Sequence, residues 1–83
     1  MTEITLLSSD ACHLCHDARL AIEEIGEMFP IRIREIDMAT PEGRLILERF
    51  RPPMPPAVLI DGELFSFGRL SRKKLVRYLE RAA

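Results

Sequence analysis

The chain has 83 residues, of which 47% are hydrophobic and 30% charged, a composition ordinary for a soluble globular domain. A chain of this length has a modest core, so we expect residues 1–83 to form a single domain. The formal net charge of −1 gives no general attraction to nucleic acid or to an anionic membrane, and we expect neither as a partner.

The cysteine content points to the compartment and to the type of chemistry. The N-terminal residues lack the basic and apolar regions of a signal peptide, and no apolar run approaches the roughly 18 residues of a membrane helix. We therefore expect a cytoplasmic protein. Thiols are mostly reduced there, so the pair Cys12 and Cys15 indicates catalysis or metal binding rather than a structural disulfide.

The first two expected elements are a strand and a helix. Residues 4–8 form a short apolar run that fits a buried strand. The N-cap residues Ser9-Asp10 interrupt it, so a helix should begin close to Cys12 and continue to about Gly26. Helical spacing of the apolar positions turns Cys15 toward the packed face and leaves Cys12 at the more exposed helix start.

A second strand and a second helix follow. Residues 31–37 alternate like a strand, with a phase slip at Glu35-Ile36 that indicates a bulge or the end of the strand. Thr40 and Pro41 then predict the N-cap and first turn of a helix over residues 41–50. We expect this helix to bury some of its apolar side chains: Leu45, Ile46, Leu47 and Phe50.

The next segment predicts a hairpin. Four of the six prolines lie in residues 51–56, which we expect to form an ordered, sharply turned connection. Residues 57–60 and 63–67 then read as two strands joined by Asp61-Gly62, a strong signal for a two-residue turn. The resulting order, with a last helix after the hairpin, predicts an α/β fold with parallel strand pairing at the start and an antiparallel hairpin near the end.

The last expected helix covers residues 72–81 and follows Ser71, a good N-cap residue. Its inner face should consist of Leu75, Val76, Leu79 and Ala82. This end of the chain is basic, with Glu80 as the single acid among six bases: Arg69, Arg72, Lys73, Lys74, Arg77 and Arg81. A solvated helix face with cations near its C-terminus explains the pattern. The alternative is a surface that docks an acidic protein partner.

The chemistry concentrates in residues 9–16, which hold both cysteines and both histidines. Free N–H groups and a partial positive charge at a helix start favour thiolate, and cysteine pKa values in such motifs fall from about 8.5 to roughly 3.5–7.5. Cys12, at the exposed end, is the expected nucleophile, and Cys15 is the expected resolving thiol. His13 or His16, if protonated near Cys12, would lower its pKa further, although each could also be an exposed residue without an essential role.

Other chemistries start from the same residues. Residues 12–16 match the Cys-x-x-Cys-His pattern of haem attachment, but the strand before the motif and the missing export signal do not suit it. Four candidate ligands lie within five residues, although one helical turn rarely directs four side chains to a tetrahedral metal. We therefore expect no cofactor and no metal. Two alternatives remain. The cysteines could bind a metal or iron–sulfur cluster shared between two chains, or they could be small buried apolar residues of the core.

With this motif after the first strand, the sequence resembles the glutaredoxin branch of the thioredoxin fold over nearly its whole length. Cys12-His13-Leu14-Cys15 and residues 55–62 carry the resemblance. It implies a β-α-β-α-β-β-α domain with a central four-stranded mixed sheet and helices on both faces. It also implies a cis-proline at Pro56 that faces the cysteines, and a substrate groove formed by His13, Leu14, Pro55 and Pro56.

Several positions depart from the usual glutaredoxin pattern. His13 and Leu14 replace the proline and aromatic residue common between the cysteines, residues 8–10 lack the upstream lysine, and residues 67–71 reduce the glycine pair and its acids. Pro55 lacks the N–H that holds glutathione or a peptide in that family. The resemblance therefore implies an oxidoreductase for protein or small-thiol disulfides that is weak with glutathione. The alternative is a non-catalytic binding module, or a metal or iron–sulfur carrier.

Overall fold

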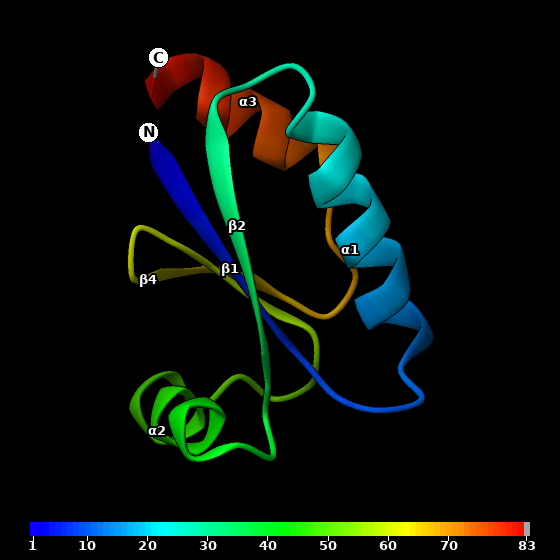
Figure 1. Cartoon of the computed structure of the whole chain (residues 1–83), viewed down its shortest axis with the longest axis vertical. Helices are drawn as coiled ribbons and strands as arrows, with labels where there is room; N and C mark the ends of the chain where they lie inside the picture. The colour runs from blue at the N-terminus through cyan, green and yellow to red at the C-terminus, as the bar shows by residue number, and fades with distance from the viewer. Residues whose placement is uncertain (83) are drawn as a thin grey trace.

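The computed structural model describes residues 1–82, so the last residue of the expected 1–83 domain lies outside it. Seven elements follow one another in the expected order (Figure 1). They are β1 (Thr2–Ser8), α1 (His13–Ile25), β2 (Ile31–Asp37), α2 (Pro41–Phe50), β3 (Ala57–Ile60), β4 (Glu63–Phe67) and α3 (Arg72–Ala82).

The four strands form one mixed sheet in the order β2-β1-β3-β4. β1 runs parallel to β2 and antiparallel to β3, and β3 runs antiparallel to β4. The hairpin between β3 and β4 turns at Asp61 and Gly62, whose φ angles of 50° and 85° are both positive, as a type I′ turn requires. The predicted parallel start and antiparallel end of the sheet are confirmed.

Helices cover both faces of the sheet, which confirms the expected fold class (Figure 1). α1 and α3 pack on one face, over a core that includes Ile4, Leu6, Ala18, Ile22, Ile25, Val58, Ile60, Leu75 and Leu79. α2 lies on the other face, where Ile46 and Leu47 pack against a smaller cluster formed by Leu7, Ile36 and Ala57. Neighbouring residues of β1 thus serve opposite cores, because side chains alternate along a strand.

Of the two explanations expected for the phase slip at Glu35-Ile36, the bulge is wrong, and the strand ends one residue later, at Asp37. β2 pairs with β1 in unbroken register from Thr2 opposite Ile31 to Ser8 opposite Asp37. The phase slip has another cause: Ile31 packs on the core beneath α1 and α3, whereas Ile36 packs on the α2 side. An edge strand that contributes to two cores carries apolar residues in both phases.

The last helix also differs slightly from the expectation. α3 extends to Ala82, and its buried residues are Leu75 and Leu79, with Val76 partly buried against the same core. Ala82 is exposed and does not belong to the inner face. Ser71 caps the helix as predicted, since its hydroxyl accepts a hydrogen bond from the N–H of Lys74 at 3.2 Å.

The start of α2 is fixed by a predicted cap and by a close backbone approach. The hydroxyl of Thr40 accepts a hydrogen bond from the Gly43 N–H at 3.1 Å, and Pro41 occupies the first turn. A Cβ atom on Gly43 would meet the carbonyl oxygen of Asp37 and lie 2.7 Å from the Cα of Met38. Glycine is therefore required where the first turn of α2 crosses the end of β2.

The connection between α2 and β3 carries the proline cluster. α2 ends at Phe50, and its C-cap residue Arg51 adopts a left-handed conformation with φ 49°. The peptide bond between Pro55 and Pro56 is cis, and Pro56 is fully buried at the start of β3.

Across residues 1–82, no helix combines the length and the apolar character needed to cross a membrane.

Candidate functional site

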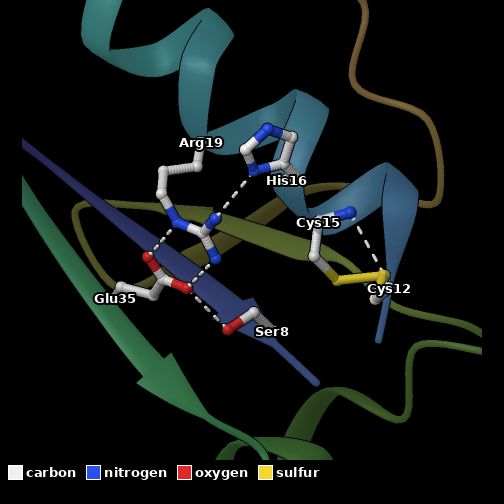
Figure 2. Close-up of polar contacts among 6 residues, drawn as sticks. All are labelled: Ser8, Cys12, Cys15, His16, Arg19 and Glu35. Carbon is white, nitrogen blue, oxygen red and sulfur yellow. Dashed lines mark hydrogen bonds and ion pairs between the residues drawn. A yellow bond between two sulfur atoms is a disulfide. The ribbon is translucent and has the colours of Figure 1, made fainter. Parts of the chain in front are cut away.

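The two cysteines lie where the central strand β1 passes into α1. After Ser8 the chain turns through Ala11, which has a left-handed conformation with φ 53°. Cys12 is extended and is itself the N-cap of α1, so the expectation of a cap at Ser9 or Asp10 is wrong. The Sγ of Cys12 accepts a hydrogen bond from the Cys15 N–H at 3.1 Å (Figure 2). A sulfur atom thus takes the part that a hydroxyl or carboxylate oxygen usually plays at a helix start.

Cys12 and Cys15 are joined by a disulfide, and their Cα atoms lie 5.2 Å apart, within the usual range for such bonds (Figure 2). The two sulfurs differ in accessibility as the helical spacing predicts. Cys15 faces the core and is 1% exposed, whereas Cys12 is half-buried at the surface. The pair therefore has one side that a second molecule can reach and one side that it cannot.

A surface pocket surrounds the accessible sulfur. Its lining includes Cys12 together with His13, His16 and Arg19 from α1, and residues 9–11 of the preceding loop. Both histidines are exposed. The structure thus brings three of the sequence-predicted site residues together, Cys12, His13 and His16.

Leu14, Pro55 and Pro56 do not line this pocket. Leu14 lines a neighbouring pocket between α1 and the start of α3, with Arg69 and Leu70. Pro55 and Pro56 line neither pocket. Antiparallel pairing of Leu7 with Ala57 puts Pro56 level with Ser8, at the end of the sheet from which the cysteine loop leaves.

A polar network that the sequence analysis did not identify lies beside the disulfide (Figure 2). Arg19 of α1 donates from Nε to Oε1 of Glu35 on β2 at 2.6 Å, and a second nitrogen of its guanidinium bonds Oε2. The Ser8 hydroxyl donates to Oε2 of Glu35 at 2.9 Å. Nδ1 of His16 lies 3.3 Å from Nη1 of Arg19. The network links the end of β1, the edge strand β2 and the second turn of α1.

This network places a guanidinium, paired with a carboxylate, in the wall of the cysteine pocket, which Asp10 also lines. The Arg19 hydrogen bonds hold the pKa of Glu35 below its usual value, burial opposes that shift, and the Ser8 hydrogen bond reinforces it. The bond to Glu35 also raises the pKa of Arg19. Since Arg19 lines the pocket at Cys12, its guanidinium favours a negative charge there.

One sequence signal points toward the network. Arg19 stands four residues after Cys15, so it follows the second cysteine on the same side of α1. Its partner cannot be read from that spacing, because Glu35 reaches Arg19 only through the parallel register of β1 and β2.

Within residues 1–82, no three side chains of His, Cys, Asp or Glu form a group able to hold a metal ion.

Comparison with solved structures shows the thioredoxin fold. An N-terminal domain of the alkylhydroperoxide reductase AhpF from Enterococcus faecalis is 25% identical over 94% of this chain and 37% of that one, with a TM-score of 0.77. Mitochondrial thioredoxin 3 from Saccharomyces cerevisiae is 15% identical over 96% of this chain and 77% of its own, with a TM-score of 0.73. Thioredoxin-2 of a malaria parasite is 10% identical over 98% of this chain and 82% of its own, with a TM-score of 0.75.

The family is shown by sequence. No curated protein sequence gives a significant match. The family model described as "Glutaredoxin-like domain (DUF836)" matches residues 3–80, a span that includes both cysteines. The thioredoxin-like fold and the closely spaced cysteine pair support a redox-type thiol function in general terms. The chain has the thioredoxin fold and belongs to the glutaredoxin-like domain family (DUF836).

Proposed function

We propose that the protein is a cytoplasmic dithiol–disulfide oxidoreductase that acts on disulfides of proteins or small molecules. One observation carries the proposal: Cys12 and Cys15 close a disulfide at the start of α1, with the first sulfur accessible and the second shielded. Attack from outside and resolution from inside then fall to different atoms.

In the reducing direction, the thiolate of Cys12 attacks one sulfur of the substrate disulfide. A mixed disulfide forms, the substrate S–S bond breaks, and the leaving thiolate takes a proton from solvent. The Cys15 thiol loses its proton to solvent, and its thiolate attacks the Cys12 sulfur. The Cys12–Cys15 disulfide forms, the second substrate thiolate leaves and is protonated, and two electrons have passed to the substrate. The same steps run backwards for oxidation.

The surroundings of Cys12 favour its thiolate. The Cys15 N–H points at the sulfur, the helix N-terminus adds a partial positive charge, and the Arg19 guanidinium lines the same pocket. The contact between Arg19 and His16 bears on the expected tuning role of His16. A guanidinium only donates, so this contact requires a ring nitrogen of His16 that accepts. We therefore assign the main electrostatic role to Arg19 and a secondary one to His13 and His16.

For the substrate groove we retain His13, Leu14, Pro55 and Pro56. His13 lines the Cys12 pocket, Leu14 lines the next pocket, and the register sets Pro56 level with the start of the cysteine loop. Pro55 has no N–H to donate to a substrate backbone. We therefore propose substrates other than glutathione disulfide.

A redox titration tests the proposal. We expect reversible formation of the Cys12–Cys15 disulfide with a midpoint in the roughly −120 to −270 mV range of known oxidoreductases. Cys12→Ser and Cys15→Ser should both abolish the two-electron transition. Purification with visible-range absorbance, or a metal content near one ion per two chains, would contradict the proposal and favour a metal or cluster carrier.

A further inference from the structure

A pocket that lies away from the disulfide opens between the edge strand β4 and α3. It holds about 550 Å³, within the range of ligand sites. Residues 64–67 of β4 line one side. The other side is lined by Arg69 and Ser71 of the connection to α3, and by Lys74, Arg77, Tyr78 and Arg81 of α3. We call it the β4–α3 pocket.

The charge of this pocket is one-sided. Its lining contains four cations and no acidic side chain. None of the four is in an ion pair with a residue of 1–82, in contrast to Arg72, which pairs with Glu24 at 2.6 Å. A dipole argument explains only part of the pattern. Arg81 lies near the helix C-terminus, where a cation is favourable, but Lys74 lies in the first turn, which has no acidic residue.

The shape of the pocket suits an extended chain. Four consecutive residues of β4 line it, and the register of β4 on β3 shifts between Leu64 and Ser66. Leu64 packs on the α2 side of the sheet and Phe65 on the α1 and α3 side, so the pocket reaches both faces and follows the outer edge of the strand. β4 is an edge strand of the sheet, so one row of its backbone N–H and C=O groups is free to pair with another strand. Apolar surface accompanies that edge, with Phe67 47% and Tyr78 39% exposed.

The β4–α3 pocket shares part of its wall with a second pocket that lies beside α1. Arg69 and Ser71 line both this pocket and the neighbouring one, which is also lined by Leu14, one of the two residues between Cys12 and Cys15. A chain segment in the β4–α3 pocket that continues past Arg69 therefore approaches the cysteine motif.

We propose that the β4–α3 pocket binds an extended acidic segment of the protein that presents its disulfide to Cys12. The segment adds a strand to the edge of β4, its carboxylates meet Arg69, Lys74, Arg77 and Arg81, and its apolar residues contact Phe67 and Tyr78. The assignment of a disulfide-bearing partner rests on the proposed function; the preference for an acidic extended segment rests on the pocket alone.

Binding is tested on the full, disulfide-closed chain with a labelled synthetic peptide in which Glu and Val alternate. We expect binding that weakens as salt is added, and at least about tenfold weaker binding of the same peptide with Gln in place of Glu. Arg77→Glu should weaken binding of the Glu peptide by about tenfold. The matched control is Arg32→Glu, an exposed cation on β2 at the opposite edge of the sheet, which should leave binding unchanged.

Two results would overturn the pocket assignment. One is equal affinity for the Glu and Gln peptides, and the other is equal weakening by Arg77→Glu and Arg32→Glu. A second measurement protects against a folding defect in Arg77→Glu. Backbone amide NMR shifts of the unaltered protein should move along β4 when the Glu peptide is added, and shifts confined to other strands would contradict strand addition.

The link to catalysis is tested with two peptide disulfides that differ only in an acidic extension. The extension should raise kcat/KM for exchange by about tenfold. In Arg77→Glu the two substrates should have equal kcat/KM. If neither substrate reacts but the Glu peptide still binds, the proposed function fails and the pocket assignment stands. If both react equally and the Glu peptide does not bind, the pocket assignment fails and the proposed function stands.

Discussion

Arg19 and Glu35 join the second turn of α1 to the edge strand β2 by a two-point ion pair that ends in the pocket of Cys12. This ion pair attaches α1, whose first turn contains Cys15 and is capped by Cys12, to the edge strand of the sheet. The guanidinium lines the pocket while its partner carboxylate lies on the sheet side, and the Asp10 side chain in the same pocket opposes the positive charge.

The first prediction concerns the pH dependence of stability. Glu35 has a pKa below its ordinary value of 4.5, so the folded state favours the charged carboxylate. Its stabilisation is therefore fully present above the ordinary pKa and declines as the pH falls through the lowered folded pKa. Urea unfolding of the disulfide-closed protein should show Glu35→Gln less stable than the unaltered chain at neutral pH, with the difference shrinking in acid. Glu27→Gln, at an exposed position, is the control. A difference that stays constant into strong acid would contradict the ion-pair account.

The second prediction assigns the two thiols. Cys15→Ser should accumulate a mixed disulfide between Cys12 and a peptide disulfide substrate, because the resolving thiol is absent. Cys12→Ser should accumulate none at the buried Cys15 over the same time, since that sulfur is 1% exposed. Mass spectrometry of the intact protein reads both results. If Cys12→Ser forms the adduct and Cys15→Ser does not, the roles are reversed.

The third prediction concerns glutathione. A glutathione-coupled assay should show much lower turnover than an ordinary dithiol glutaredoxin, because Pro55 offers no N–H to the ligand backbone. Pro55→Val restores that donor and should raise the turnover by about fivefold, the value of one net hydrogen bond. Pro53→Val, at an exposed proline of the same connection, should leave it unchanged. Turnover of the unaltered protein equal to that of an ordinary glutaredoxin would refute this interpretation.

The fourth prediction concerns Gly43. Glycine to alanine inside a helix usually stabilises by about 1 kcal/mol. Here the new methyl group would collide with the backbone of Asp37 and Met38, so Gly43→Ala should instead destabilise by about 1–3 kcal/mol. Arg44→Ala, at an exposed site in the same helix, should stay within about 0.5 kcal/mol. Chemical denaturation measures both variants, and a stabilised Gly43→Ala would show that the two backbones can separate.

The sequence was most informative where a local signal acts alone. Thr40 and Pro41 mark the start of α2, and Asp61-Gly62 marks the hairpin, because caps and tight turns are set by a few neighbouring residues. The cysteine spacing likewise predicted that Cys12 is more exposed than Cys15. These signals, with the order of the elements, were enough for the fold.

The errors arose where distant segments decide the outcome. The phase slip in β2 reflects packing on two cores, which one strand's pattern cannot distinguish from a bulge. The cap at Cys12 follows a left-handed turn at Ala11, a backbone conformation that an alanine in the sequence does not predict. Arg19 and Glu35 meet through a strand register, so their relation to the cysteines was visible only in the folded chain.

The hydrogen bond from the Cys15 N–H to the Cys12 sulfur couples the ionisation of the Cys12 thiol to the formation of the first turn of α1. When the pair is reduced, a thiolate at this position is a stronger acceptor for the helix N–H groups than a neutral thiol. Proton release from Cys12 and tightening of the first turn of α1 therefore favour each other, and thermodynamic linkage makes the two effects equal in free energy. Substitutions that stabilise the first turn of α1 should thus also make the Cys12 thiol more acidic.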